Sequence, residues 1–409
     1  MTEATEGAIT DSDLLMSAPV ARTPRPRRYR VGGRGGRTSP PAAQGSLFDV
    51  EVRSELRYYS QMMDALARSG FGGEALPAEL TISKLFGTVW SGQPVPRDGS
   101  LEESFGLGLV DFARGHVSVT SVALLQTLAV VAPIREVRQA AEKALRDDNR
   151  PDPHWTDRPG AVVAGRCWAY EDVFGDQTIV LSEFAYGRDP RVDDRHAILL
   201  QIDHVAFSAA VNTMLVDAVD VTVRELTHEA ANSGGMFSIR QVDPAWARAI
   251  QARALSRADL IPEVPLWPRY ADVRALALAR LAVLSEAADI LPLEPEPPGP
   301  AGRGAIVREF LASPAAADLD PGYADAVARV VLDHGCAHDP GNVIRVSPAK
   351  WDSFLFDWWP SRQLPGPWPA VVVAWSEWAA EHLGLPRQAR EELADALSES
   401  LESGPSADA

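Results

Sequence analysis

Near residue 160 the spacing of apolar residues changes from the three-to-four-residue repeat of helices to continuous apolar runs typical of strands. Three apolar runs, rich in β-branched and aromatic residues, follow one another over residues 161–170, 178–186 and 197–203. Their connections are short, and the first contains the turn-forming residues Phe174, Gly175 and Asp176. Short connections favour antiparallel pairing, because a parallel crossover needs about a dozen residues or more. The sequence therefore predicts an antiparallel meander in the middle of the chain.

Helical spacing of apolar residues dominates on both sides of this segment, with apolar side chains recurring every three or four positions. Helices are predicted over residues 47–66, 77–91, 117–132 and 134–146 before the meander, and over 220–232, 243–258 and 270–288 after it. Six of the eleven tryptophans lie in the last hundred residues, on predicted short helices broken by prolines. At that spacing they are expected to form core. The predicted fold class is α+β, mostly helical, with a small antiparallel sheet in the middle region.

Composition divides the chain into six segments. Residues 1–46 are poor in apolar side chains, so they cannot bury enough surface to offset the entropy lost on ordering. A Pro/Glu/Gly stretch over residues 291–304 is typical of an extended linker. The predicted segments are a disordered Arg/Gly-containing arm (1–46), a helical region (47–149), an antiparallel sheet plus helices (150–290), the linker (291–304), a Trp-rich helical region (305–402) and a disordered tail (403–409).

The arm differs in charge from the rest of the chain. The formal net charge is −17, and residues 21–37 contain seven arginines and no acid, so the other residues carry −24. An acidic body repels phosphates over a Debye length of about 8–10 Å, which argues against broad contact with nucleic acid or an anionic membrane. Weak nucleic-acid contact is therefore confined to the arm. The predicted nucleic-acid or partner contacts are Arg25, Arg27, Arg28, Arg30, Arg34 and Arg37.

Cysteine usage and the N-terminal residues indicate a cytoplasmic protein. Cys167 and Cys336 are the only cysteines and lie far apart in sequence, which is typical of a reducing compartment. Residues 1–20 lack the basic and apolar regions of a secretory signal. The longest apolar stretch, residues 117–134, contains polar side chains and is better interpreted as a buried helix than as a membrane span.

Complete cofactor and nucleophile motifs are absent from the sequence. There is no G-x-x-x-x-G-K-[ST] loop, and the VGGRGGR stretch is neither preceded by a strand nor followed by a helix. No G-x-S-x-G elbow of the serine-hydrolase type occurs either. We therefore predict no cofactor.

The stretch DHGCAHD places four possible metal ligands within six residues, namely His334, Cys336, His338 and Asp339. The alternative interpretation is a turn that ends a helix, with Gly335 as the C-terminal cap. That interpretation is favoured, because a single turn rarely wraps four ligands around one ion.

Asp203 and His204 end the third predicted strand and are the best-placed candidates for chemistry. A carboxylate beside an imidazole can support acid–base catalysis or metal binding, and Glu183 on the preceding strand could supply a further carboxylate. Side chains of neighbouring strand residues point to opposite faces, so Asp203 and His204 do not share a pocket unless a bulge intervenes. A structural, hydrogen-bonded histidine at a strand end is the favoured interpretation.

Two stretches resemble an uncharacterised family of hypothetical proteins from high-GC bacteria. In AILLQIDHVAFSAAVNTMLV an apolar strand ends in Asp-His, as it does in that family. The stretch VSPAKWDSFLFDWWPSRQL is similar to the family's C-terminal portion, with a Ser-Pro step and an Asp-Trp-x-Pro-Arg-like helix. The resemblance covers about residues 50–400. The family has no known activity, so the resemblance implies a layout and no mechanism.

The resemblance is carried by individual residues at both stretches. Those matching the family pattern are Asp203 and His204, then Asp357 and Trp358, then Pro360 and Arg362 with Ser361 inserted between them. After His204 this sequence departs from the family, because apolar residues replace a turn that contains glycine. A close approach of the backbone to a ligand there is consequently in doubt.

Two classes of function remain. The first is a non-enzymatic cytosolic interaction protein that works through helical surfaces, with the basic arm as an accessory contact. The second is a metal-assisted hydrolase or nuclease that uses Asp203, His204 and Glu183. The absence of any complete catalytic motif favours the first.

Overall fold

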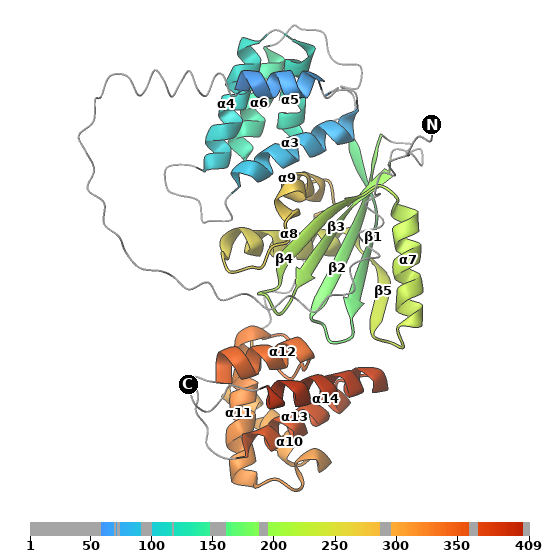
Figure 1. Cartoon of the computed structure of the whole chain (residues 1–409), viewed down its shortest axis with the longest axis vertical. Coiled ribbons are helices and arrows are strands. Elements are labelled where there is room, and N and C mark those ends of the chain that lie inside the picture. Colours follow the sequence, from blue (N-terminus) through green and yellow to red (C-terminus); the bar gives the residue numbers. More distant parts are fainter. Residues whose placement is uncertain are drawn as a thin grey trace, which may run out of the picture. The chain divides into compact units, whose positions relative to one another are not determined.

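The computed structural model describes residues 59–403, apart from 69–70, 72–73, 91–99, 117, 148–160, 188–194, 287–295 and 360–366. The predicted arm and its arginines lie outside this range, as do residues 404–409 of the predicted tail. Helices flank one sheet in the middle of the sequence (Figure 1), which confirms the mostly helical α+β class. Within the described ranges, no helix is both long and apolar enough to cross a membrane.

The sheet has five antiparallel strands in the order β4-β3-β2-β1-β5. The three predicted strands correspond to its centre, and one further strand is added at each edge. The strands are β1 (Val162–Asp172), β2 (Gln177–Tyr186), β3 (Arg195–Asp203), β4 (Ala209–Val216) and β5 (Phe237–Val242).

The turn between β3 and β4 explains why β4 escapes a sequence-based prediction. Phe207 and Ser208 adopt positive φ angles of 64° and 51°, which tight hairpin turns require and which glycine or asparagine usually provides. Because the turn sequence contains neither residue, it carries no hairpin signal. The apolar residues after it could equally continue into another element.

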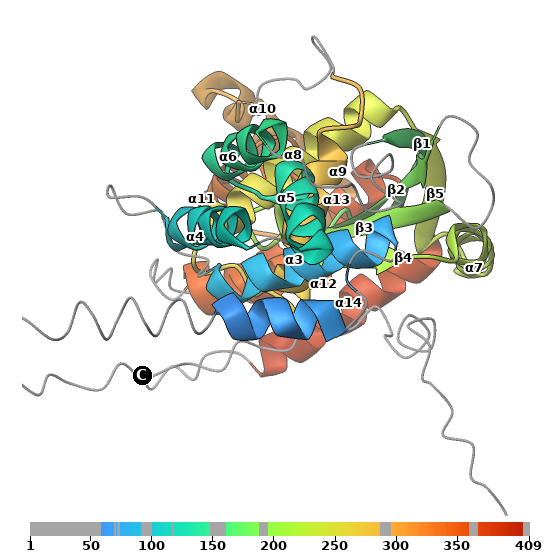
Figure 2. The same ribbon diagram turned by 90° about the horizontal axis from the view of Figure 1, so that it is seen from above.

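Helices from both ends of the first 290 residues share one core with the sheet. Cys167, Val180 and Phe184 from one sheet face pack in this core with apolar residues of α3, α5, α8 and α9. Figures 1 and 2 show α3 across α9 and beside α5, and α7 along β5. The helices are α3 (Ala75–Val89), α4 (Leu101–Gly115), α5 (Val119–Val131), α6 (Arg135–Arg146), α7 (Val219–Asn232), α8 (Pro244–Leu260) and α9 (Tyr270–Leu281).

A second core is formed by the Trp-rich C-terminal helices, where Trp351, Trp359, Trp375 and Trp378 are all buried. Prolines in the first turns begin these helices, because a missing N–H costs nothing there. The elements are α10 (Pro300–Leu311), α11 (Pro321–His338), α12 (Pro348–Ser353), a turn of π-helix (Phe354–Trp358), α13 (Trp368–His382) and α14 (Arg387–Glu402).

The boundary of the predicted linker needs correction. Residues 300–304 are helical, because Gly299 and Pro300 occupy the N-cap and first position of α10. The Gly-Pro pair that looks like linker sequence therefore starts a helix.

Candidate functional site

Asp203 and His204 lie at the end of β3 and hold the β3–β4 turn. One Asp203 carboxylate oxygen accepts the backbone N–H groups of Val205 and Ala206, both at 2.9 Å. The His204 ring bonds the Thr178 hydroxyl through Nε2 at 2.9 Å and the Ser208 hydroxyl through Nδ1 at 3.2 Å. All these bonds run to neighbouring elements of the same hairpin or to the adjacent strand β2. The pair therefore has a structural role in shaping the turn.

Burial shifts the pKa of both side chains. It raises the pKa of Asp203 above the usual range, although the two backbone N–H groups favour the charged carboxylate. It lowers the pKa of His204, and the nearby Arg345 guanidinium lowers it further. The lowered pKa favours the neutral ring, which can donate to one of the two hydroxyl groups and accept from the other.

Glu183 lies far from this pair along the same sheet. In the β2–β3 register, Glu183 pairs with Ala197 whereas Asp203 pairs with Gln177. Six residues of strand separate the two positions, which corresponds to about 20 Å. Asp203, His204 and Glu183 therefore do not converge on one site.

At its own position Glu183 belongs to an ion-pair group at the other end of the sheet. Its carboxylate accepts Arg166 Nε at 3.1 Å and Arg195 Nη1 at 2.9 Å. Both arginines also reach Asp220 at the start of α7. The hydrogen bond from Arg195 is the main cause that lowers the pKa of Asp220. This group connects β1 and β3 with α7.

A larger cluster of buried charges lies beside Asp203 and His204. Arg345, in the connection from α11 to α12, pairs with Asp176 in the β1–β2 turn and with Asp339 after α11. Arg345 Nη1 also donates to the Phe174 carbonyl oxygen at 3.3 Å. Lys350 Nζ lies 3.6 Å from Asp339 Oδ2. Two segments about 170 residues apart are thus joined by charge-assisted hydrogen bonds.

Lys350 of this cluster, and Asp172 in the last position of β1 beside it, have strongly displaced pKa values. Burial raises the pKa of Asp172 to about 6, and the charge of Asp176 adds to the shift. Burial lowers the pKa of Lys350 to about 8, and Arg345 contributes in the same direction. Displaced values of this kind occur both at catalytic sites and in structural ion-pair networks.

The hydrogen bonds of Asp172 indicate the structural alternative. Its Oδ1 accepts the N–H groups of Phe174 at 2.8 Å and Asp176 at 3.2 Å, and its Oδ2 accepts that of Gln177. All three donors belong to the β1–β2 turn or the first residue of β2. The carboxylate therefore fixes the turn that presents Asp176 to Arg345.

The amino-acid sequence marks the carboxylates near the β1–β2 turn but not their partner. An acid at a strand end, followed by a glycine turn, is a visible signal at residues 172–176. Nothing local marks Arg345 as the cation that they meet. Its pairing depends on the packing of Phe174 and Met236 into the C-terminal core.

The four candidate metal ligands after residue 333 are not brought to one point. His334 and His338 are one helical turn apart, with ring centroids separated by 4.5 Å. Cys336 is buried in the C-terminal core, and Asp339 is bound to Arg345 and Lys350. Among the residues that the structure describes, no three His, Cys, Asp or Glu side chains are grouped so that they could hold a metal ion.

Gly335 is not a helix cap, contrary to the expectation from sequence. Helix α11 continues to His338, so Gly335 lies within it. A Cβ atom on Gly335 would lie 2.0 Å from the carbonyl oxygen of Val343. The glycine is required there because the returning chain passes against the helix backbone.

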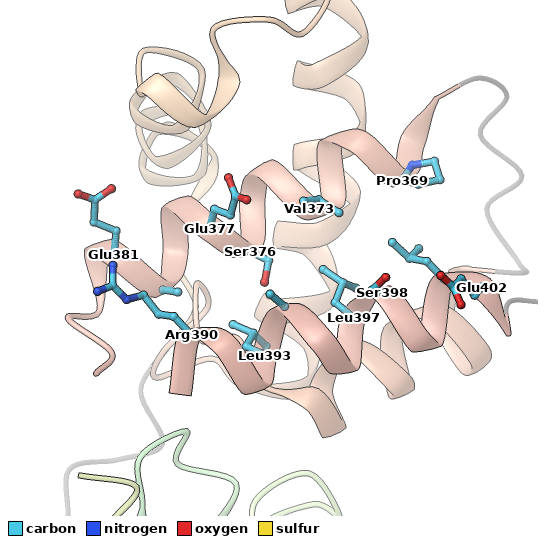
Figure 3. Close-up of a pocket in the computed structure, with 13 residues that line it drawn as sticks. Pro369, Val373, Ser376, Glu377, Glu381, Arg390, Leu393, Leu397, Ser398 and Glu402 are labelled. Carbon is cyan, nitrogen blue, oxygen red and sulfur yellow. The ribbon is translucent and has the colours of Figure 1, made fainter. Parts of the chain in front are cut away.

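A groove of about 580 Å³ runs between α13 and α14 (Figure 3). Apolar side chains line much of it, and Val373 is 38% exposed there although valine usually favours the interior. Its lining residues include Val373, Glu377, Glu381, Arg390, Leu401 and Glu402. Sequence analysis assigned the C-terminal aromatic residues to the core and gave no indication of this groove.

These features define an α-rich α+β protein. An ion pair between Arg345 and Asp176 connects a turn of its sheet to the C-terminal helices, and an apolar groove lies between its last two helices. Comparison of the chain with known protein families, with curated proteins and with solved structures finds no match.

Proposed function

We propose that the chain is a non-enzymatic cytoplasmic interaction protein that binds a helical segment of a partner protein in the α13–α14 groove. The observation that carries the proposal is the groove itself, which exposes apolar side chains of two adjacent helices. Exposed apolar surface gains free energy when a partner covers it. The cytoplasmic location is supported by Cys167 and Cys336, which are both free, buried thiols.

The alternative, a metal-assisted hydrolase or nuclease, has less support. Its three residues Asp203, His204 and Glu183 belong to two groups of side chains at opposite ends of the sheet. In each group the carboxylate oxygens bond turn N–H groups or arginines. Catalysis would need these groups to meet one substrate atom.

The proposal is tested with a peptide and one matched pair of variants. The probe is a fluorescent 18-residue amphipathic helix that has Leu at positions i, i+3, i+4 and i+7 and Gln elsewhere. Val373→Arg places a long charged side chain in the groove, whereas Val221→Arg makes the same change at a valine on α7 with the same exposure, 38% against 39%. We expect the first variant to weaken binding at least tenfold and the second to leave it unchanged. Absence of binding, or equal effects of both variants, would contradict the proposal.

The basic arm is proposed as an accessory contact for nucleic acid or for the same partner. The support is its composition, with seven arginines and no acid in residues 21–37. Weak binding to a single-stranded oligonucleotide should disappear when residues 1–46 are deleted and should fall steeply with salt, because bound cations are released from the phosphates. Binding that survives the deletion would refute this part.

A further inference from the structure

The two walls of the groove are each a single helical face. On α13 the lining residues fall at positions 369, 373, 376, 377, 380 and 381, and on α14 at 390, 393, 394, 397, 398, 401 and 402. These are the i, i+3, i+4 and i+7 spacings of one side of a helix. Ridges with that spacing accept the matching ridges of another helix laid along the groove. The shape therefore fits a helix better than an extended strand, which would need free backbone groups to pair with.

The charges around the groove are unbalanced. Together α13 and α14 contain seven acids and two arginines, a formal net charge of −5. Three of the lining residues are glutamates, and only one is an arginine. In Figure 3, Glu381 lies beside Arg390 at one end of the groove, whereas Glu377 lies on the α13 wall and Glu402 at the far end of α14. The excess negative charge is thus distributed over both walls.

We infer that the occupant of this groove is a basic amphipathic helix, with an apolar stripe against α13 and α14 and Lys or Arg side chains on both flanks. The inference rests on the proposed function, since it names the chemistry of the partner. The stripe would cover the exposed Val373 on α13 and the half-buried Leu401 on α14, while the basic flanks would meet Glu377 and Glu402. A second copy of this face is a poor occupant, because two helix pairs of charge −5 would repel each other.

The test compares three 18-residue amphipathic peptides that share one leucine stripe and differ only in the other positions, which are Lys, Gln or Glu. Binding is measured by fluorescence anisotropy at about 50 mM salt, where screening is modest. We expect the Lys peptide to bind at least fivefold more tightly than the Gln peptide, and the Glu peptide to bind most weakly. A Lys/Leu peptide of the same composition but scrambled order, with no apolar face, should bind at least tenfold more weakly than the ordered one.

Matched variants separate attraction by the two groove glutamates from attraction by the net negative charge of the whole protein. Glu377→Gln combined with Glu402→Gln removes two charges at the groove. Glu225→Gln combined with Glu263→Gln removes two exposed charges elsewhere. We expect the first pair to reduce the preference for Lys over Gln to less than twofold and the second pair to preserve it.

The outcomes separate a failure of the proposed function from a failure of the basic occupant. If no amphipathic peptide binds, or if Val373→Arg has no effect on any of them, the groove is not a docking surface and the proposed function fails. If the Gln or Glu peptide binds as tightly as the Lys peptide and Val373→Arg still blocks it, the proposed function stands and the basic occupant is wrong. A preference for Lys that Glu377→Gln with Glu402→Gln leaves intact also overturns the inference.

Discussion

Arg345 forms an ion pair with Asp176, 169 residues earlier in the chain, and the same guanidinium binds Asp339. The pair connects the β1–β2 turn with the segment that follows α11. Phe174, from the same turn, is buried in the C-terminal core. The β1–β2 turn therefore contacts the C-terminal helices through both an ion pair, from Asp176, and a buried apolar side chain, Phe174.

Replacing Arg345 should be strongly destabilising. Arg345 is 8% exposed, and Arg345→Met would leave the partly desolvated Asp176 carboxylate without this cation and Asp339 with Lys350 alone. Breaking a buried pair by removing one partner costs about 3–5 kcal/mol. Urea denaturation should show this loss, whereas Arg329→Met, which removes an exposed pair with Asp325 within one helix, should change stability little. Similar losses of stability in both variants would mean that the ion pairs of Arg345 do not stabilise the fold more than an exposed pair does.

Loss of the hydroxyl group should lower the free energy of unfolding at one buried tyrosine and leave it unchanged at another. The Tyr186 hydroxyl donates to Glu79 and accepts from Arg280 Nη2 at 2.8 Å. The Tyr270 hydroxyl is buried with no hydrogen-bond partner in the described part of the chain. Tyr186→Phe should cost about 1.5–3 kcal/mol, as hydrogen bonds to charged groups do, and Tyr270→Phe should cost nothing. Thermal or urea unfolding of the two variants checks the contrast, and equal losses would contradict it.

The fold class could be predicted from the sequence because it depends on local periodicity. The apolar runs that became β1, β2 and β3 are signals of neighbouring residues, and so are the helical spacings around them. Strand β4 could not be predicted, since Phe207 and Ser208 adopt positive φ without the residues that usually mark such turns.

The candidate site was less predictable than the fold, because it depends on distant contacts. The sequence identified Asp203 and His204 as a strand end, but their partners come from β2 and from the turn itself. The contact of Arg345 with Asp176 joins segments 169 residues apart, one of which is held by a residue buried in the C-terminal core, Phe174. Ion pairs between such distant residues leave no periodic trace in a single sequence.

The role of Gly335 also depends on a contact with another segment of the chain. A glycine near the end of an apolar helix looks like a cap, yet here it gives room to the Val343 carbonyl oxygen. Gly335→Ala should destabilise the protein by about 3 kcal/mol or more, because a backbone contact of 2.0 Å can be relieved only by moving the chain. Gly115→Ala, at the end of α4 with open space around it, should cause no loss. Chemical denaturation of both variants gives the comparison, and a tolerated Gly335→Ala would contradict the close approach of the Val343 carbonyl to the helix.

The ammonium group of Lys350 is buried near Asp339 and Arg345. Burial lowers its pKa from 10.5 to about 8, so folding favours the neutral amine. Between these two values the unfolded chain still holds the proton that the folded chain has lost, and stability therefore rises with pH across this window. Below pH 8 the folded protein bears the full cost of a buried charge.

Lys350→Met should accordingly stabilise the protein at pH 7, by about 1–3 kcal/mol, because it replaces a buried charge by an apolar side chain of similar length. The advantage over the unmodified protein should shrink steadily from pH 8 to pH 10.5, because over this range the folded lysine is neutral while the unfolded lysine still binds a proton. Lys143→Met, at an exposed position on α6, provides the control and should show no such trend. Urea denaturation at pH 7, 8.5 and 10 measures all three proteins. A Lys350→Met variant that is less stable at pH 7 would show that the ion pair with Asp339 outweighs the cost of burial.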